Sequence, residues 1–326
     1  MLNVFVQKPQ GLTRIAQAAD DTFPPDAVWF DLLEPTPEEE KAVEHALNID
    51  VPTREEMREI EASNRLYEEN GVLYMTATIV TKLDTDLPQS TQVTFILAGH
   101  TLVTNRYTDP LPFRRFTTYA ETHPAVCSST QQLLAGLLEA VINRIADVIE
   151  RVGADLDQIS AEVFAPARRH QRPATSRDFR HVLGRVGQNG ELVSKVRESL
   201  VSLGRLLVFV QQAPNSQIQQ EPRARFRTLT RDVAALTDHA SFLGDKVMFV
   251  LDATLGMVSI DQNNILKIFS VVTVFLLPPS VIAGFYGMNF EHIPWLHETW
   301  GWYGALGMMA ASSILPWLWF KRKGWL

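Results

Sequence analysis

A line of small and polar side chains crosses the C-terminal part of the sequence at steps of four and three residues, which places them on one face of a helix. In order, its members are Asp252, Gly256, Ser259, Asn263, Leu266, Ser270, Thr273, Leu277, Ser280 and Gly284, and the line leads to Asn289. Amide, hydroxyl and carbonyl oxygens accept hydrogen bonds from the polarised waters of a hydrated cation without holding the ion too tightly. The two leucines of the line would be apolar constrictions that gate by dewetting. The chemistry predicted for this face is therefore the passage of an ion.

Two other interpretations of this line stay open. Small residues at heptad spacing also allow transmembrane helices to pack closely against each other. Continued backwards, the line reaches Asp245 and Asp238, and aspartates at this spacing are also typical of a solvated helix face. The continuity of the line with Asn289, together with the lack of a second polar span, favours a water-filled axis.

The residues around the line are apolar enough to lie in a membrane. Two uncharged runs of 19 residues, Ile268 to Tyr286 and Trp302 to Phe320, approach the roughly 20 residues that a helix needs to cross a bilayer. Lys267 precedes the first run and Lys321, Arg322 and Lys323 follow the second, whereas no Lys or Arg lies between the runs. By the positive-inside rule, both chain ends are cytoplasmic and the connecting loop faces the outside.

An oligomer is required if the line borders a pore, because two spans from one chain cannot enclose a water-filled axis. Closed cyclic symmetry, with one lining helix from each chain, is the simplest arrangement. Glu291 and Glu298, in the loop between the runs, would raise the concentration of cations at the mouth.

The sequence ahead of the spans predicts an α/β domain at 1–127 followed by a helical stalk at 128–267. Thr36, Pro37 and Glu39 predict a capped helix start. Strands are expected where β-branched and aromatic residues gather, at 2–6, 27–33, 66–68, 72–81, 92–97 and 101–105.

Three long helices are expected in and beyond the stalk. The first carries an apolar heptad seam, which predicts that it packs on other helices. The seam consists of Leu134, Leu138, Val141, Ile145, Val148, Val152, Leu156 and Ile159. The second helix is expected at 177–211. The third begins at Pro222 and continues through the first span, which makes it about 100 Å long if it is unbroken.

Composition excludes several classes of protein. The net charge of -7 argues against nucleic acid as a partner and favours the transport of cations. A single cysteine, Cys127, excludes an intrachain disulfide framework, and the N-terminus lacks the pattern of a cleaved signal peptide. No Gly-rich phosphate loop is present, so no nucleotide is expected. Since no nucleophile lies in a recognisable arrangement with a base, no enzyme is predicted.

The stretch Tyr286-Gly287-Met288-Asn289-Phe290, placed at the end of the first of two C-terminal spans, resembles the Gly-Met-Asn signature of the CorA family of divalent-cation channels. The similarity extends from Asp261-Gln262-Asn263 through Pro278-Pro279 to the closing Phe320-Lys321-Arg322-Lys323-Gly324-Trp325-Leu326. The chain is most similar to the proteobacterial magnesium and cobalt branch. The earlier domains agree with the family in order but diverge in sequence.

This resemblance implies a homopentameric funnel in the bacterial inner membrane, with an α/β cytosolic domain and a long helical stalk continuing into two transmembrane helices. It implies a pore-lining helix at 268–288, a periplasmic loop at 289–301, a second transmembrane helix at 302–320 and a cytosolic basic tail at 321–326. It also implies passive, potential-driven uptake of Mg²⁺, with Co²⁺ and Ni²⁺ also passing, and gating by cytosolic Mg²⁺.

The resemblance gives several of these residues a role. Gly287, Met288 and Asn289 match the selectivity filter, and Lys321, Arg322 and Lys323 match a basic collar. The pore lining falls on members of the polar line, namely Asn263, Leu266, Thr273, Leu277, Ser280 and Gly284, with Ser270 on the same face. Asp252 matches an acidic position at the inner end of the pore helix. The regulatory metal site does not align without gaps. Its candidates are Asp238, Asp245 and Asp252, which share one helix face, and Asp232.

Two alternatives stay open, of which the second belongs to a different functional class. One is a Zn²⁺ transporter of the related ZntB type, although that branch usually departs from Met at the position of Met288. The other is a non-conducting scaffold or sensor whose spans only anchor the α/β domain. Efflux instead of uptake also stays open, since a passive pore follows the gradient.

Overall fold

The computed structural model describes residues 1–15, 23–59, 61–83, 85, 88–164, 176–214, 218–288, 294, 298 and 300–323. The chain divides into two compact units, Met1–Asp252 and Ala253–Leu326.

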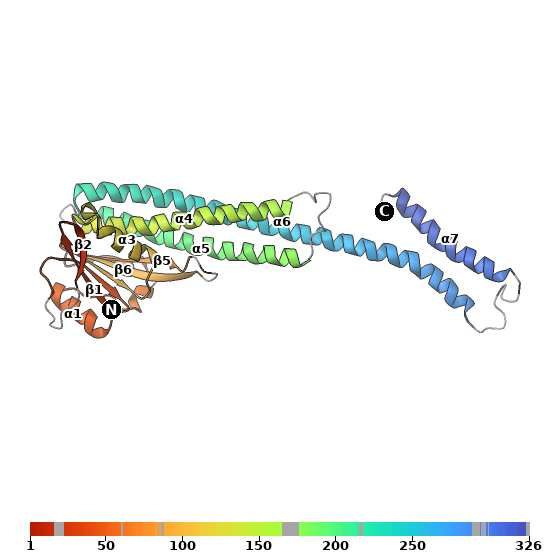
Figure 1. Ribbon diagram of the computed structural model, residues 1–326, viewed down its shortest axis with the longest axis horizontal. Coiled ribbons are helices and arrows are strands. Elements are labelled where there is room, and N and C mark those ends of the chain that lie inside the picture. Colours follow the sequence, from red (N-terminus) through yellow and green to blue (C-terminus); the bar gives the residue numbers. More distant parts are fainter. Residues whose placement is uncertain are drawn as a thin grey trace. The chain divides into compact units, whose positions relative to one another are not determined.

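A mixed β-sheet lies at one end of the first unit, beside the long helices (Figure 1). Its strand order within the described residues is β2-β1-β3-β7-β6-β5-β4, with β3 and β7 parallel and the other neighbours antiparallel. The strands are β1 (Leu2–Lys8), β2 (Gly11–Ile15), β3 (Ala27–Leu33), β4 (Leu66–Glu69), β5 (Val72–Thr81), β6 (Gln89–Ala98) and β7 (Thr101–Arg106). A tight turn at Asn70-Gly71 joins β4 to β5, and both residues have the positive φ that such a turn requires. All the predicted strands are present, and β2 is an addition that the sequence did not indicate.

Helices cover both faces of the sheet. On one face, α1 (Pro37–Leu47) packs Val43 against Phe30, Leu32 and Val103. The capping box predicted for α1 is confirmed, because Glu39 N donates to Thr36 Oγ1 at 3.3 Å and Thr36 N donates to Glu39 Oε2 at 3.0 Å. The other face receives α3 (Leu111–Ala120), whose aromatic side chains lie against the sheet. Two short 3-10 helices, η1 (Glu56–Arg58) and η2 (Pro124–Cys127), and the short α2 (Ala62–Arg65) complete this part of the described chain.

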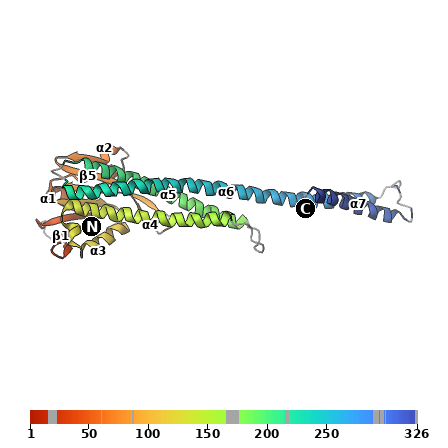
Figure 2. The same cartoon turned by 90° about the horizontal axis from the view of Figure 1, so that it is seen from above.

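Three long helices lie side by side in the first unit (Figure 2). They are α4 (Thr130–Phe164), α5 (Ser176–Gln212) and the beginning of α6 (Gln220–Tyr286). Every member of the predicted seam on α4 is at most 3% exposed, which confirms that this face packs on other helices. The hydroxyl of Ser199 on α5 donates to the Thr78 carbonyl at 2.8 Å, so α5 is also attached to strand β5.

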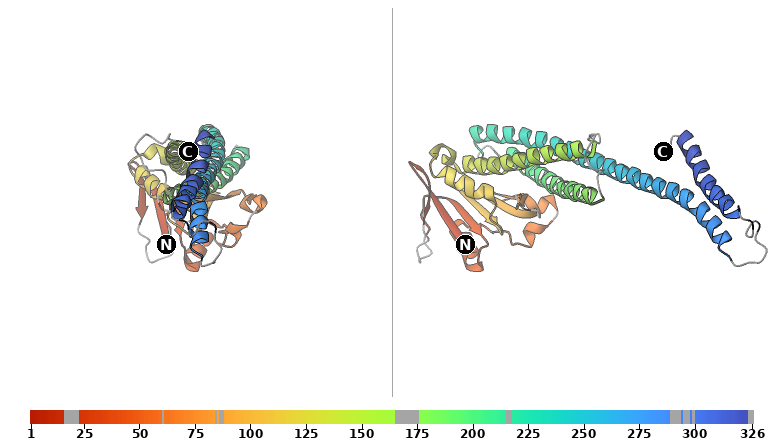
Figure 3. Two further views of the ribbon diagram at one scale, coloured as in Figure 1. Left: turned by 90° about the vertical axis from the view of Figure 1, so that its right-hand side faces the viewer. Right: turned by 45° about the vertical axis from the view of Figure 1, so that its right-hand side comes forward.

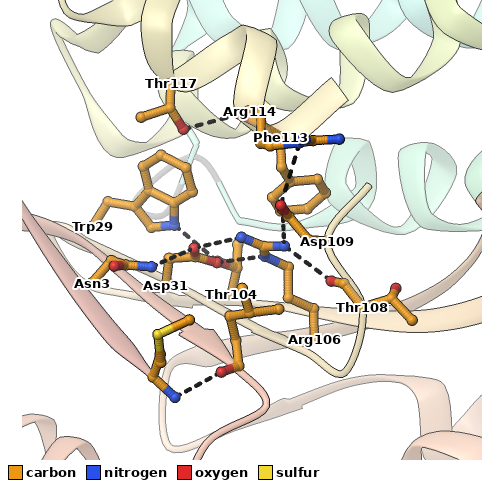
Figure 4. A network of polar contacts seen from close by, with 12 residues as sticks. Asn3, Trp29, Asp31, Thr104, Arg106, Thr108, Asp109, Phe113, Arg114 and Thr117 are labelled. Atoms are coloured by element: carbon orange, nitrogen blue, oxygen red, sulfur yellow. Dashed lines mark hydrogen bonds and ion pairs between the residues drawn. The ribbon is translucent and has the colours of Figure 1, made fainter. Parts of the chain in front are cut away.

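A buried polar network joins strands β3 and β7 (Figure 4). Arg106 Nε and Nη2 donate to the two carboxylate oxygens of Asp31, each at 2.8 Å. Thr104 Oγ1 donates to Asp31 Oδ1 at 2.8 Å, and Trp29 Nε1 donates to Thr104 Oγ1 at 3.0 Å. The ion pair and the hydrogen bonds offset the desolvation cost of placing these charges beneath α3.

The second unit contains the end of α6 and the returning helix α7 (Gly301–Arg322), which runs in the opposite direction (Figure 3). Within the described residues, α6 is the one helix that is long and apolar enough to cross a membrane by the measures of length and mean hydropathy. The mean hydropathy of α7 is too low to meet the same criterion, since this helix contains Trp, Tyr, Gly and Pro, which have low hydropathy. Aromatic residues of this kind are typical of helix ends at a membrane interface. The second span therefore stays a prediction.

Candidate ion pathway

The polar line lies intact on an exposed face of α6. Within the second unit, each of its members from Gly256 to Gly284 is exposed. The two leucines are prominent, with Leu266 62% and Leu277 57% exposed. The flanking apolar residues are exposed as well, including Phe269, Leu276 and Val281 at 61–66%. So large an apolar surface marks a contact with lipid or with other protein.

Two hydroxyls of the line are held by the helix backbone. Thr273 Oγ1 donates to the Phe269 carbonyl at 2.8 Å, and Ser280 Oγ donates to the Leu276 carbonyl at 2.7 Å. Because each hydroxyl has one proton, the lone pairs of its oxygen remain as acceptors. Water bound to a cation donates its hydrogens outward, so these oxygens suit a hydrated cation and disfavour an anion.

The first two residues of the Gly-Met-Asn signature continue the backbone hydrogen bonding of α6. Gly287 N donates to the Ala283 carbonyl at 2.9 Å, and Met288 N donates to the Phe285 carbonyl at 3.3 Å. The last carbonyls of a helix lack intrahelical donors and carry the negative end of the helix dipole, which favours a cation beside them. Asn289 and Glu291 lie outside the described residues, whereas Glu298 is described and exposed.

The residues predicted to form a basic collar lie at the C-terminal end of α7. Lys321 Nζ lies 4.9 Å from the centre of the Trp317 ring, and Lys323 Nζ lies 5.9 Å from that of Trp319. These cation–π contacts orient two ammonium groups that could otherwise move freely. Arg322 is exposed between them.

The three aspartates proposed for regulation are exposed on α6 in the first unit. Successive members of Asp238, Asp245 and Asp252 are seven residues apart, which is about 10.5 Å along a helix. Since Mg²⁺–oxygen bonds are about 2.1 Å long, no two of these carboxylates in one chain can coordinate one ion directly. The part of the chain that the structure describes contains no cluster of three or more His, Cys, Asp or Glu side chains able to hold a metal.

Comparison with known proteins decides the family. The family model described as "CorA-like Mg2+ transporter protein" matches residues 25–322. The chain is 32% identical to the magnesium transport protein CorA of Haemophilus influenzae and 33% identical to that of Salmonella typhimurium, over the whole length of both chains in each case. The chain belongs to the CorA-like Mg²⁺ transporter family. The resemblance seen in the sequence is confirmed.

The CorA fold is also confirmed. The complete structure of the CorA magnesium transporter from Methanocaldococcus jannaschii is similar to this chain, with a TM-score of 0.76 at 17% sequence identity. The similarity covers 100% of this chain and 99% of the Methanocaldococcus chain. The α/β domain followed by long helices, expected from the resemblance, is therefore the architecture of this CorA-family chain.

The sequence interpretation missed two features of this CorA-family chain. Phe242 and Phe249, both 59% exposed, lie between the three aspartates at the same steps of four and three residues. Ser312 and Ser313 interrupt the apolar second run, and Ser313 contacts α6. A polar pair inside an apolar run was the available signal for the second feature.

Proposed function

We propose that this chain forms a passive, membrane-potential-driven channel for Mg²⁺ that also passes Co²⁺ and Ni²⁺ and is gated by cytosolic Mg²⁺. The observation that supports this proposal most strongly is the exposed line of small and polar residues on an otherwise apolar helix segment, which ends at the Gly-Met-Asn signature. The names of the relatives, which are magnesium transport proteins, support the choice of ion.

The proposed pathway is built by a homopentamer in the bacterial inner membrane, with two spans in each chain and both chain ends in the cytoplasm. One α6 from each copy would present its polar line to the axis. The exposed apolar residues beside the line would then contact neighbouring copies, α7 or lipid. A single α6 has no way to surround an ion, so an assembly is a physical requirement of this proposal.

Selectivity would arise at a ring of Asn289 side chains with the carbonyls of Gly287 and Met288. Neutral oxygens suit an ion that keeps its waters, because Mg²⁺ dehydrates reluctantly. Glu291 and Glu298 would concentrate cations outside, and Leu266 and Leu277 would close the pore by dewetting.

The driving force would need no nucleotide. A divalent ion that crosses 100 mV gains about 4.6 kcal/mol, which is twice the roughly 2.3 kcal/mol per charge. Mg²⁺ would thus be both the cargo and the regulatory ligand, and the chain would act as a transporter and not as an enzyme.

Reconstitution in liposomes tests this proposal. Purified protein is incorporated into vesicles that contain a Mg²⁺-sensitive dye, and a K⁺ gradient with valinomycin sets the potential. We expect Mg²⁺ entry that increases as the inside becomes negative and that needs no nucleotide. Parallel assays use Co²⁺, Ni²⁺ and Zn²⁺.

Each other outcome has a definite meaning. Entry of Zn²⁺ in strong preference to Mg²⁺ would support the ZntB-type alternative. No flux of any divalent cation from well-incorporated protein would support the scaffold alternative and contradict the proposal.

A further inference from the structure

Helix α6 contains two consecutive prolines, Pro278 and Pro279, within its second-unit segment. Proline has no backbone N–H, so each one leaves the carbonyl four residues earlier without its helical donor. The carbonyls concerned are those of Val274 and Phe275. In an apolar environment such a carbonyl is costly unless another donor reaches it.

A donor for one of these carbonyls comes from the other helix. Ser313 Oγ on α7 donates to the Phe275 carbonyl at 3.2 Å. This is the carbonyl that Pro279 leaves unpaired. The contact is partly buried and joins positions 38 residues apart in the sequence.

The surroundings of Ser313 allow this close approach. The preceding residues of α7 include Ala310, Ala311 and Ser312, and small side chains let two helices come near each other. The hydroxyl of Ser312 is used differently, since it donates to the Met309 carbonyl of its own helix at 2.8 Å. Of these two adjacent serines, Ser313 is therefore the one that bonds to α6.

The broken turn lies within the polar line. Leu277 precedes the prolines and Ser280 follows them, so the geometry of this turn sets where both side chains point. Ser280 also bonds to the Leu276 carbonyl, which is the next one along the same turn. A bond that holds the Phe275 carbonyl thus fixes the part of α6 where a constriction and an ion-facing hydroxyl are neighbours.

We propose that Ser313 is a positioning residue for the ion pathway: its hydroxyl replaces the hydrogen bond that Pro279 removes and so connects α7 to the orientation of Leu277 and Ser280. The proposal rests on the proposed function for its effect on flux. The bond itself can be tested without transport.

A double-mutant cycle between Ser313 and Pro279 provides the test. In the full-length protein, Ser313→Ala is expected to lower Mg²⁺ flux about fivefold, the effect of losing one net hydrogen bond of ordinary strength. Ser313→Thr keeps the hydroxyl and is expected to retain most of the flux. Ser312→Ala is the matched control and should leave flux unchanged.

Pro279→Ala decides the mechanism. This substitution restores an N–H that can pair with the Phe275 carbonyl, so Ser313→Ala should then cause no further loss of flux. An equal loss in the two backgrounds, or an equal loss from Ser312→Ala, would overturn the proposal.

Amide hydrogen exchange supplies the readout that does not depend on transport. In detergent, Ser313→Ala should speed exchange over 276–286 in the native background but not in the Pro279→Ala background. If the wild type conducts and Ser313→Ala changes neither flux nor exchange, this inference fails and the proposed function stands. If Ser313→Ala speeds exchange only in the native background and the wild type does not conduct, the proposed function fails, but the hydrogen bond between Ser313 and Phe275 is supported.

Discussion

Thr273 and Ser280 lie seven residues apart on the same face of α6, and each donates its hydroxyl proton to the carbonyl four residues before it, at 2.8 and 2.7 Å. Their outward-facing oxygens are therefore acceptors. This arrangement suits the waters of a hydrated cation, whose hydrogens point away from the metal.

Removal of these acceptors should slow transport. We expect Thr273→Val and Ser280→Ala each to reduce Mg²⁺ flux about fivefold, because one acceptor of about 1 kcal/mol is lost at each position. Thr273→Ser keeps the oxygen and is the control. Full flux in Thr273→Val, measured at matched protein density in vesicles, would show that the line packs helices and does not line a pore.

The pair of Arg106 and Asp31 should stabilise the first unit. Both side chains are at most 5% exposed, so removal of Arg106 leaves the buried carboxylate of Asp31 without its cationic partner. Burial alone would lower the pKa of Arg106, but the hydrogen bonds and charges of Asp31 and Asp109 together outweigh it and hold that pKa above the usual value. We expect Arg106→Ala to destabilise the unit by about 3–5 kcal/mol and to lower its Tm by about 10 °C.

Arg114 provides the matched control for this pair. Its side chain is 64% exposed and contacts Asp109 at 3.3 Å, so Arg114→Ala should cost less than about 1 kcal/mol. Thermal unfolding of the full-length protein in detergent makes the comparison. Similar Tm values for Arg106→Ala and Arg114→Ala would contradict a stabilising role for the buried network.

Cys127 should be unreactive in the folded protein. Its thiol is buried, and burial raises its pKa to about 11. The thiolate is the reactive form, and with this pKa almost none is present at pH 7 while the chain is folded. A maleimide at pH 7 should label Cys127 only after a denaturant is added. Rapid labelling of the native protein would show that the region around η2 opens readily.

Internal Mg²⁺ should inhibit the channel by binding to Asp238, Asp245 and Asp252 of α6. Cytosolic Mg²⁺ between the carboxylates of neighbouring copies would hold the pore closed, and its loss would let like charges repel. Replacing Asp238, Asp245 and Asp252 by Asn should raise the half-inhibiting internal Mg²⁺ concentration about tenfold, as expected for a loss of about 1.4 kcal/mol in binding.

Patch-clamp recording with varied internal Mg²⁺ measures this change. Glu221→Gln, at an exposed position near the start of α6, is the control and should leave the inhibition unchanged. An equal response in the triple variant and the wild type would remove these aspartates from the regulatory site.

Local signals in the sequence account for much of the fold. The capping box at Thr36 and the heptad seam of α4 depend on residues within a few turns of one another, so their spacing is visible directly. Strand β2 has five residues and gains its stability from pairing with β1, and this pairing is not marked by composition.

Contacts between residues far apart in the sequence were not predictable from local patterns. Arg106 and Asp31 are 75 residues apart, and Ser313 and Phe275 are 38 residues apart. The polar line was visible because helical periodicity brings its members together within one element. A ring of several copies depends on contacts between chains, which the helical periodicity of one chain does not mark, and the predicted filter position Asn289 lies outside the described residues.

Growth rescue tests the central claim most directly. The wild-type chain and its Asn289→Ala variant are expressed at equal levels in a bacterium that lacks its own Mg²⁺ transport, and growth is followed at low Mg²⁺. The proposed channel predicts rescue by the wild type and at least about tenfold weaker Mg²⁺ uptake by Asn289→Ala, because the neutral oxygens of the filter are lost. Equal rescue by the two proteins, or no rescue by a well-expressed wild type, would contradict it.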